Sequence, residues 1–203
     1  MKISTPFTSE EFSNIIKNMS LGKSPGRDSL PIDAFKNSAE LTSILVACAN
    51  NTFLQRQDLP TSLRSVLFRL IPKEVKNPSD LMNFDNFRPT GLLSIAYRII
   101  SKAISNRIQP ALQKIIGSPQ FAYLHGRRAE NISRIVSEMM LQSLSDPNPD
   151  VITLKLDFKK AFDSISFQYI RCILENINTP QIMLDLTMNM MCNLTAWRRD
   201  NYQ

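Results

Sequence analysis

Apolar residues recur with a helical period along most of the chain. Thr8 and Glu11 form a capping-box pair immediately before the first periodic segment, and Gly22 is a natural stop after it. Pro110 either interrupts the longest periodic segment or begins its continuation. The spacing predicts helices over about residues 9–21, 31–37, 41–58, 95–116, 132–140, 169–176 and 180–191.

Only short segments have the composition of strands. Residues 65–71 are rich in β-formers and end at Pro72, and residues 151–156 form an apolar run that ends on Asp157. Residues 118–128 are predicted to be extended, and residues 74–86 to be a polar loop. Two prolines in the polar stretch 145–150 mark a boundary. The pattern predicts an α+β fold without βαβ alternation, so a doubly wound nucleotide-binding fold is not expected.

The composition is that of an ordinary globular protein and excludes several classes. The three cysteines, Cys48, Cys172 and Cys192, are odd in number and far apart, which excludes a complete disulfide framework and a CxxC metal site. With His125 as the single histidine, a histidine-rich metal site is not expected. No apolar run approaches the length of a membrane span, and no secretory signal is visible. We therefore expect an intracellular protein, in nucleus or cytoplasm, with no membrane partner.

Positive charge is concentrated in one third of the chain. Residues 64–128 carry 11 Lys and Arg against 3 Asp and Glu, a net charge of +8. The remainder carries 13 basic and 15 acidic residues, a net charge of −2. Such a segment is expected on a face that meets a polyanion, although an ordinary solvated surface explains it equally well.

Asp157 is the strongest candidate for chemistry. A carboxylate at the end of an apolar strand places a hard oxygen ligand on a rigid support, which is what a Mg²⁺ site requires. Lys159 and Lys160 follow it and could meet phosphates that the metal bridges. Alternatively, Asp157 only ends the strand, and Asp163 is more simply explained as the cap of the next helix.

Five short segments in collinear order stand out as motifs. They are KSPGRDSLP at 23–31, LP at 59–60 with LIPK at 70–73, FRPTGLL at 87–93 followed by YR at 97–98, QFAYLHGRRAENI at 120–132 and LDFKKAFD at 156–163. These motifs resemble those of the reverse transcriptases of non-LTR (LINE-type) retrotransposons. Each is weak alone, but their order makes the resemblance specific, and it extends through nearly the whole chain.

The resemblance implies helix-rich fingers with a few short strands over residues 1–150 and an incomplete polymerase palm over residues 151–203. In this family a primer 3′-hydroxyl attacks the α-phosphate of a nucleotide and pyrophosphate leaves, with two Mg²⁺ ions about 4 Å apart. The resemblance makes Asp157 the catalytic carboxylate that bridges both ions, with the carbonyl of Phe158 as a further metal ligand.

The resemblance also assigns a nucleotide site. Lys73 and Arg88 would hold the triphosphate, combining a point charge with a forked guanidinium. Phe162 would lie under the sugar and exclude a 2′-hydroxyl, and the amides near Lys160 and Ala161 would bind the same phosphates. The plainer alternatives are surface charges beside prolines for the two cations and a core aromatic for Phe162.

The implied partners are an RNA template, a DNA primer, deoxynucleoside triphosphates, and the remaining palm and thumb segments of a longer polyprotein. Lys23 and Arg27 would contact the template backbone from a Pro-Gly loop. Gln120 and Arg127 would line the template-facing side of the fingers, and a structural role in a turn is an equal alternative for both. His125 is expected to be a surface or capping residue.

The second palm carboxylate motif of the family, an Asp-Asp pair, does not occur in these 203 residues. One carboxylate cannot hold two Mg²⁺ ions in a defined geometry, so we expect no polymerase activity from this chain alone. A second hypothesis is a non-catalytic basic nucleic-acid-binding module. A third is an unstable remnant or helical interaction protein, which exposed Met183, Met190 and Met191 would indicate.

Overall fold

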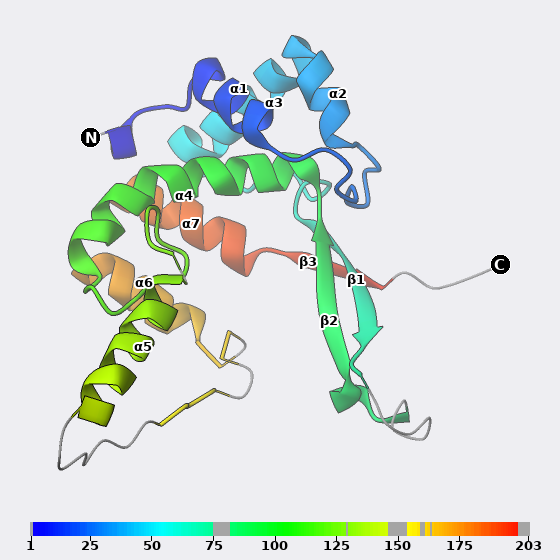
Figure 1. Ribbon diagram of the computed structural model, residues 1–203. Coiled ribbons are helices and arrows are strands. Elements are labelled where there is room, and N and C mark those ends of the chain that lie inside the picture. Colours follow the sequence, from blue (N-terminus) through cyan, green and yellow to red (C-terminus); the bar gives the residue numbers. More distant parts are fainter. Residues whose placement is uncertain are drawn as a thin grey trace. The chain divides into compact units, whose positions relative to one another are not determined.

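The computed structural model describes residues 2–74, 82–128, 130–145, 154–158, 161–162 and 164–198 (Figure 1). The chain divides into two compact units. The first comprises Met1–Ser105 and Phe167–Gln203, and the second comprises Asn106–Ser166. The fold is α+β, as predicted: helices predominate, and the described strands form one small sheet.

The first unit begins with four helical segments. They are η1 (Lys2–Ser4), α1 (Ser9–Asn18), α2 (Ile32–Asn37) and α3 (Ala39–Gln55). The side chain of Thr8 accepts a hydrogen bond from the amide of Glu11, which confirms the predicted cap of α1. Helices α1, α2 and α3 pack on one another. The ring of Phe7 makes T-shaped contacts with the rings of Phe12 and Phe53. This cluster forms the core of the N-terminal part.

Three strands form a mixed sheet in the order β2-β1-β3. Strand β1 (Ser65–Pro72) pairs antiparallel with β2 (Phe87–Leu93), which follows the short helix η3 (Phe84–Asn86). Strand β3 (Thr195–Arg198) comes from the far end of the sequence and pairs parallel with β1 over Ser65–Phe68. The predicted strand at 65–71 is confirmed, whereas β2 and β3 were not predicted.

Strand β2 escaped prediction because Pro89 and Gly91 indicate a turn. The structure accommodates both. Strand β2 lies at the edge of the described sheet and pairs there with β1 alone. An edge strand tolerates a proline, because one side of its backbone has no neighbouring strand that needs an N–H. At Gly91, an added Cβ would lie 2.9 Å from Cγ1 of Val66, so the absence of a side chain allows the close approach of the two strands.

Helix α4 (Ile95–Ile115) contains Pro110 and has no break there. The helix therefore continues past this proline and is not interrupted by it. The first half of α4 carries a row of buried apolar residues: Ile95, Ile99, Ile100, Ala103 and Ile104. Helices α6 (Phe167–Asn176) and α7 (Gln181–Cys192) complete this unit and pack against each other. Met183 and Met190 are buried, so the exposed methionines that would have indicated an unstable remnant are not found at these two positions.

The second unit contains the end of α4, the segment 116–128 and helix α5 (Glu130–Ser145). Helix α5 was predicted, but none of its residues is buried. The segment 118–128, predicted to be extended, forms turns instead. The compact units divide the chain differently from the predicted boundary at residue 150, and the assignment of 1–150 to fingers and 151–203 to palm stays a prediction. No described helix is long and apolar enough to cross a membrane.

Candidate active site and nucleic-acid interface

The β1–β2 hairpin brings Lys73 and Arg88 together. Ile71 is the cross-strand partner of Arg88, and the amide of Lys73 donates to the carbonyl of Asn86 at 2.8 Å, which continues the ladder by one residue pair. Side chains alternate between the two faces of a strand, so residues 71, 73 and 88 share one face. Lys73 and Arg88 are diagonal neighbours, a relation that places side chains about 7–8 Å apart. Both residues are exposed.

Arg69 extends this face, although the motifs did not single it out. It pairs with Thr90, lies two residues from Ile71 along β1 and is exposed. Its position in the alternation could have revealed it, because residues 69, 71 and 73 must share a face if 65–71 is a strand. We call Arg69, Lys73 and Arg88 the hairpin cations. They form one positively charged face at the outer half of the hairpin.

The base of the hairpin is buried, whereas its outer half projects from the rest of the first unit (Figure 1). Ser65 and Val66 are buried, whereas Phe68, Leu70 and Ile71 are exposed. Strand β3 pairs only with the inner residues Ser65–Phe68. The anchored base therefore fixes the direction of the hairpin, and the hairpin cations lie where a ligand can reach them.

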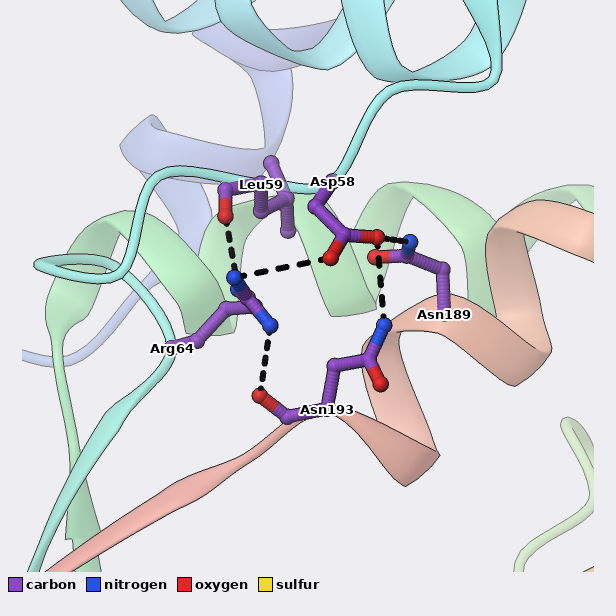
Figure 2. A network of polar contacts seen from close by, with 5 residues as sticks. All are labelled: Asp58, Leu59, Arg64, Asn189 and Asn193. Carbon is purple, nitrogen blue, oxygen red and sulfur yellow. Dashed lines mark hydrogen bonds and ion pairs between the residues drawn. The ribbon is translucent and has the colours of Figure 1, made fainter.

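A polar network fastens this base to the end of α7 (Figure 2). Arg64 donates from Nε to the carbonyl of Leu59 at 2.6 Å and from Nη1 to the carbonyl of Asn193 at 3.0 Å. Asp58 lies 3.6 Å from Nη2 of Arg64 and accepts hydrogen bonds from the side-chain amides of Asn189 and Asn193. The carbonyl of Arg64 accepts from the amide of Thr195 at 3.0 Å, which starts the pairing with β3. One arginine thus joins the start of β1 to the start of β3.

Tyr97 makes a second connection to α7. Its hydroxyl donates to the carbonyl of Met190 at 2.7 Å across a separation of 93 residues. Burial raises the pKa of the Tyr97 phenol to about 12, because a phenolate is poorly solvated there. Together with the Arg64 network, this bond holds α7 against the start of α4.

The loop that carries Lys23 and Arg27 is docked on the start of α4. A Cβ on Gly26 would lie 2.5 Å from the backbone nitrogen of Ser94, so only glycine fits there. The guanidinium of Arg98 donates to the carbonyls of Ser24 and Leu93. Lys23 and Arg27 are exposed on this fixed loop. Their predicted contact with a template stays a prediction.

Arg127 has a defined structural role in the second unit. Its guanidinium donates to the carbonyls of Ile116, Gly117 and Gln120, which closes the turn after α4. The side-chain amide of Gln120 donates to the carbonyl of Ala122 at 3.3 Å. These contacts support the alternative that both residues stabilise a turn. Their role at a template surface stays a prediction.

The segment around Asp157 differs from the prediction. Residues 154–158 form neither helix nor strand, and Leu154 and Leu156 are exposed. The strand predicted for 151–156 is thus absent from 154–156, and residues 151–153 lie outside the described residues. A strand needs a neighbour to bond its backbone, and no described strand pairs with this segment. Asp157 is exposed on an irregular segment rather than at the end of a strand.

The aromatic residues of the same motif are open to solvent. Phe158 and Phe162 are 81% and 80% exposed, which contradicts the alternative that Phe162 is a core aromatic. The ring of Phe162 contacts Tyr123 edge to face, with centroids 6.3 Å apart. Ala161 is exposed beside it. Lys159, Lys160 and Asp163 lie outside the described residues. The nucleotide-binding roles of Phe162, Lys160 and Ala161 stay predictions.

The described residues do not assemble a metal centre. No group of three or more His, Cys, Asp or Glu side chains is found among them, and Asp157 offers a single exposed carboxylate. Two closely spaced Mg²⁺ ions require several carboxylate or phosphate oxygens in a fixed arrangement. The metal-binding side chains among the described residues therefore do not fit the two-ion site that the sequence motif implies. The roles of Asp157 and Phe158 as metal ligands stay predictions.

Comparisons with known proteins support the motif-based resemblance. A family model described as "Reverse transcriptase (RNA-dependent DNA polymerase)" matches residues 71–202. The chain is 30% identical over 169 residues to the transposon TX1 uncharacterized 149 kDa protein of Xenopus laevis, covering 83% of this chain and 12% of that protein. It is 27% identical over 161 residues to the RNA-directed DNA polymerase from mobile element jockey of Drosophila melanogaster, covering 78% of this chain and 17% of that protein.

The chain thus spans less than a fifth of the length of either relative. The family match includes Lys73, Arg88, Asp157 and Phe162, and it begins after the loop that carries Lys23 and Arg27. These matches confirm the resemblance that the five motifs predicted.

Proposed function

Because the chain belongs to the reverse transcriptase family, we propose that it supplies the nucleotide- and template-binding part of the RNA-directed DNA polymerase of a non-LTR retrotransposon. The observation that carries this proposal is the register of the β1–β2 hairpin. That register sets Lys73 and Arg88 as diagonal neighbours on one face, within the matched region.

The hairpin cations suit a triphosphate. Arg88 presents a planar fork that can bond two phosphate oxygens, and Lys73 supplies a compact ammonium beside it. Arg69 adds a third positive charge on the same face. Three cations on one exposed face match the several negative charges of a deoxynucleoside triphosphate. The exclusion of a 2′-hydroxyl by Phe162, whose ring is exposed in the second unit, is proposed from its motif alone.

The template side of the proposal rests on the docked loop. Lys23 and Arg27 are exposed on a loop whose position Gly26 fixes against Ser94. A loop held in this way can present charges to a nucleic-acid backbone without losing much conformational entropy on binding. In the second unit, Gln120 and Arg127 would shape the fingers surface by closing the turn after α4.

Reverse transcriptases generally use Mg²⁺, which stabilises the attacking and leaving oxygens during phosphoryl transfer. In the proposal Asp157 would be one ligand of that metal in a complete domain. Since the described donor set does not fit a two-ion site, we derive no catalytic step from this chain alone. The chain's own contribution is to hold the nucleotide and the template.

Nucleotide binding tests this proposal. Titration with a fluorescent deoxynucleoside triphosphate should show binding that weakens about tenfold or more in Arg88→Gln and in Lys73→Gln, since each removes a charge-assisted contact worth about 1.5–3 kcal/mol. Lys17→Gln is the matched control, because Lys17 is exposed at the end of α1, remote in sequence from the hairpin. Equal affinities in all three variants would contradict the assignment.

Primer extension tests the expected lack of activity in the isolated chain. With primed RNA and Mg²⁺, the 203-residue protein should incorporate no nucleotide, because its sequence holds no Asp-Asp pair to complete the metal site. Incorporation that disappears in Asp157→Asn would show that this expectation is wrong and that Asp157 acts within a complete site.

The second candidate is a nucleic-acid-binding module without catalysis. It is favoured by the net charge of +8 over residues 64–128. In this case RNA would bind with strong salt dependence, Asp157→Ala would leave that binding unchanged, and the fluorescent nucleotide would not bind. The nucleotide titration therefore separates the two candidates.

A further inference from the structure

A shallow surface cavity of about 250 Å³, wide open to solvent, lies along the solvent side of α4 in the first unit. It is lined by Leu93, Tyr97, Arg98, Ser101, Lys102 and Ser105. Residues 98, 101, 102 and 105 follow the i, i+3, i+4, i+7 spacing of one helix face, and the opposite face of α4 is buried. The cavity is smaller than sites for whole drug-sized ligands, so it suits a compact group such as a phosphate.

The lining is positively charged. None of the six residues is acidic. Within the described part of the chain, the partners of Arg98 are two neutral carbonyls, those of Ser24 and Leu93, so no carboxylate neutralises its guanidinium there. That guanidinium has five N–H donors, and the two bonds leave others available. Ser101 and Lys102, which line the same cavity, are exposed residues.

The geometry of the helix sets the spacing of the two cations. Arg98 and Lys102 are four residues apart, which separates their Cα atoms by about 6 Å along the axis. Neighbouring phosphates of one nucleic-acid strand have a comparable separation. The bond from Arg98 to Ser24 also connects the cavity to the loop that carries Lys23. A strand that passes over this loop can therefore continue along the cavity.

We propose that the cavity on α4 is a binding site for the phosphodiester backbone of a single-stranded nucleic acid, held by Arg98 and Lys102 and by the hydroxyls of Ser101 and Ser105. The inference rests on the proposed function, since it extends the path of the template beyond the docked loop. It assigns a binding role to Arg98 and Lys102, for which the sequence motifs implied none.

Salt-dependent binding of a labelled oligouridine by the full 203-residue chain tests the site. One contact to a single strand contributes about −0.7 to the slope of log K against log salt, which corresponds to about fivefold in affinity near 0.1 M salt. Lys102→Gln should lower the affinity about fivefold and make the slope less steep by about 0.7. Lys17→Gln removes the same charge from another exposed helical position and should show neither.

A second pair of variants tests the cavity without removing a cation. Ser101→Asp adds a carboxylate to the lining that contains the two cations and should weaken binding by more than fivefold, whereas Ser13→Asp, at an exposed position of α1, should have little effect. The same titrations with oligothymidine distinguish an RNA site from one that accepts either strand chemistry.

The outcomes separate this inference from the function on which it rests. If the wild-type chain binds oligouridine and Lys102→Gln behaves like Lys17→Gln in both affinity and slope, the cavity site is wrong and the proposed function stands. If the wild-type chain binds neither nucleic acid nor nucleotide, the proposed function itself is wrong.

Discussion

Arg64 should be the most sensitive polar residue of the first unit. Its side chain is 16% exposed and donates to the carbonyls of Leu59 and Asn193. Hydrogen bonds from a charged donor contribute about 1.5–3 kcal/mol each, and removal of the donor leaves two carbonyls unsatisfied. The ion pair with Asp58, which is about half exposed, adds less than about 1 kcal/mol. We expect Arg64→Met to lower the free energy of unfolding by about 3 kcal/mol.

Urea unfolding followed by circular dichroism measures this change. Arg56→Met is the control, because Arg56 is 63% exposed and its ion pair with Asp185, at 3.5 Å, also reaches α7. That variant should lose less than about 0.5 kcal/mol. Hydrogen exchange at the amide of Thr195, which donates to the carbonyl of Arg64, should accelerate only in Arg64→Met. Equal stability of the two variants would refute the view that Arg64 anchors the hairpin.

Two further predictions concern the start of α4. Gly26→Ala should lower the free energy of unfolding by about 1–3 kcal/mol and weaken oligouridine binding, because its Cβ would meet the backbone of Ser94 and Leu93. Gly117→Ala is the control, since the nearest atom to its Cβ would lie 3.5 Å away. Thermal unfolding should show little change in this control. Stability should fall as pH rises from 10 to 12, because an unfolded Tyr97 ionises near 10 while the buried phenol resists ionisation until about 12. In Tyr97→Phe, unfolding measured at several pH values should lose this component of the pH dependence.

The helices could be predicted from sequence because their apolar faces repeat over several turns. The cap at Thr8 and the buried face of α4 are local patterns that packing did not override. The pairing of β1 with β3 depends on residues about 130 apart, and its register is set by Arg64 and Thr195 rather than by any local pattern. Non-local pairing of this kind cannot be derived from spacing.

The candidate site was predictable only in part. Lys73 and Arg88 were found through motifs, and the structure adds the register that makes them neighbours. Arg69 and Lys102 were missed because neither belongs to a motif; each is identified by the face it shares with other cations. The strand before Asp157 was predicted from an apolar run, but an apolar run forms a strand only when a neighbour supplies hydrogen bonds, and Leu154–Leu156 have none among the described strands.

The central claim is that one face of the β1–β2 hairpin binds the triphosphate of a nucleotide. Photo-crosslinking with a deoxythymidine triphosphate that carries an azidoanilide group on its γ-phosphate, followed by peptide mapping, tests it most directly. The account predicts crosslinks in peptides that contain residues 69–73 or 87–90, competed by unlabelled deoxynucleoside triphosphate and lost in Arg88→Gln. Crosslinks confined to helices α1 to α3, unchanged in Arg88→Gln, would contradict it.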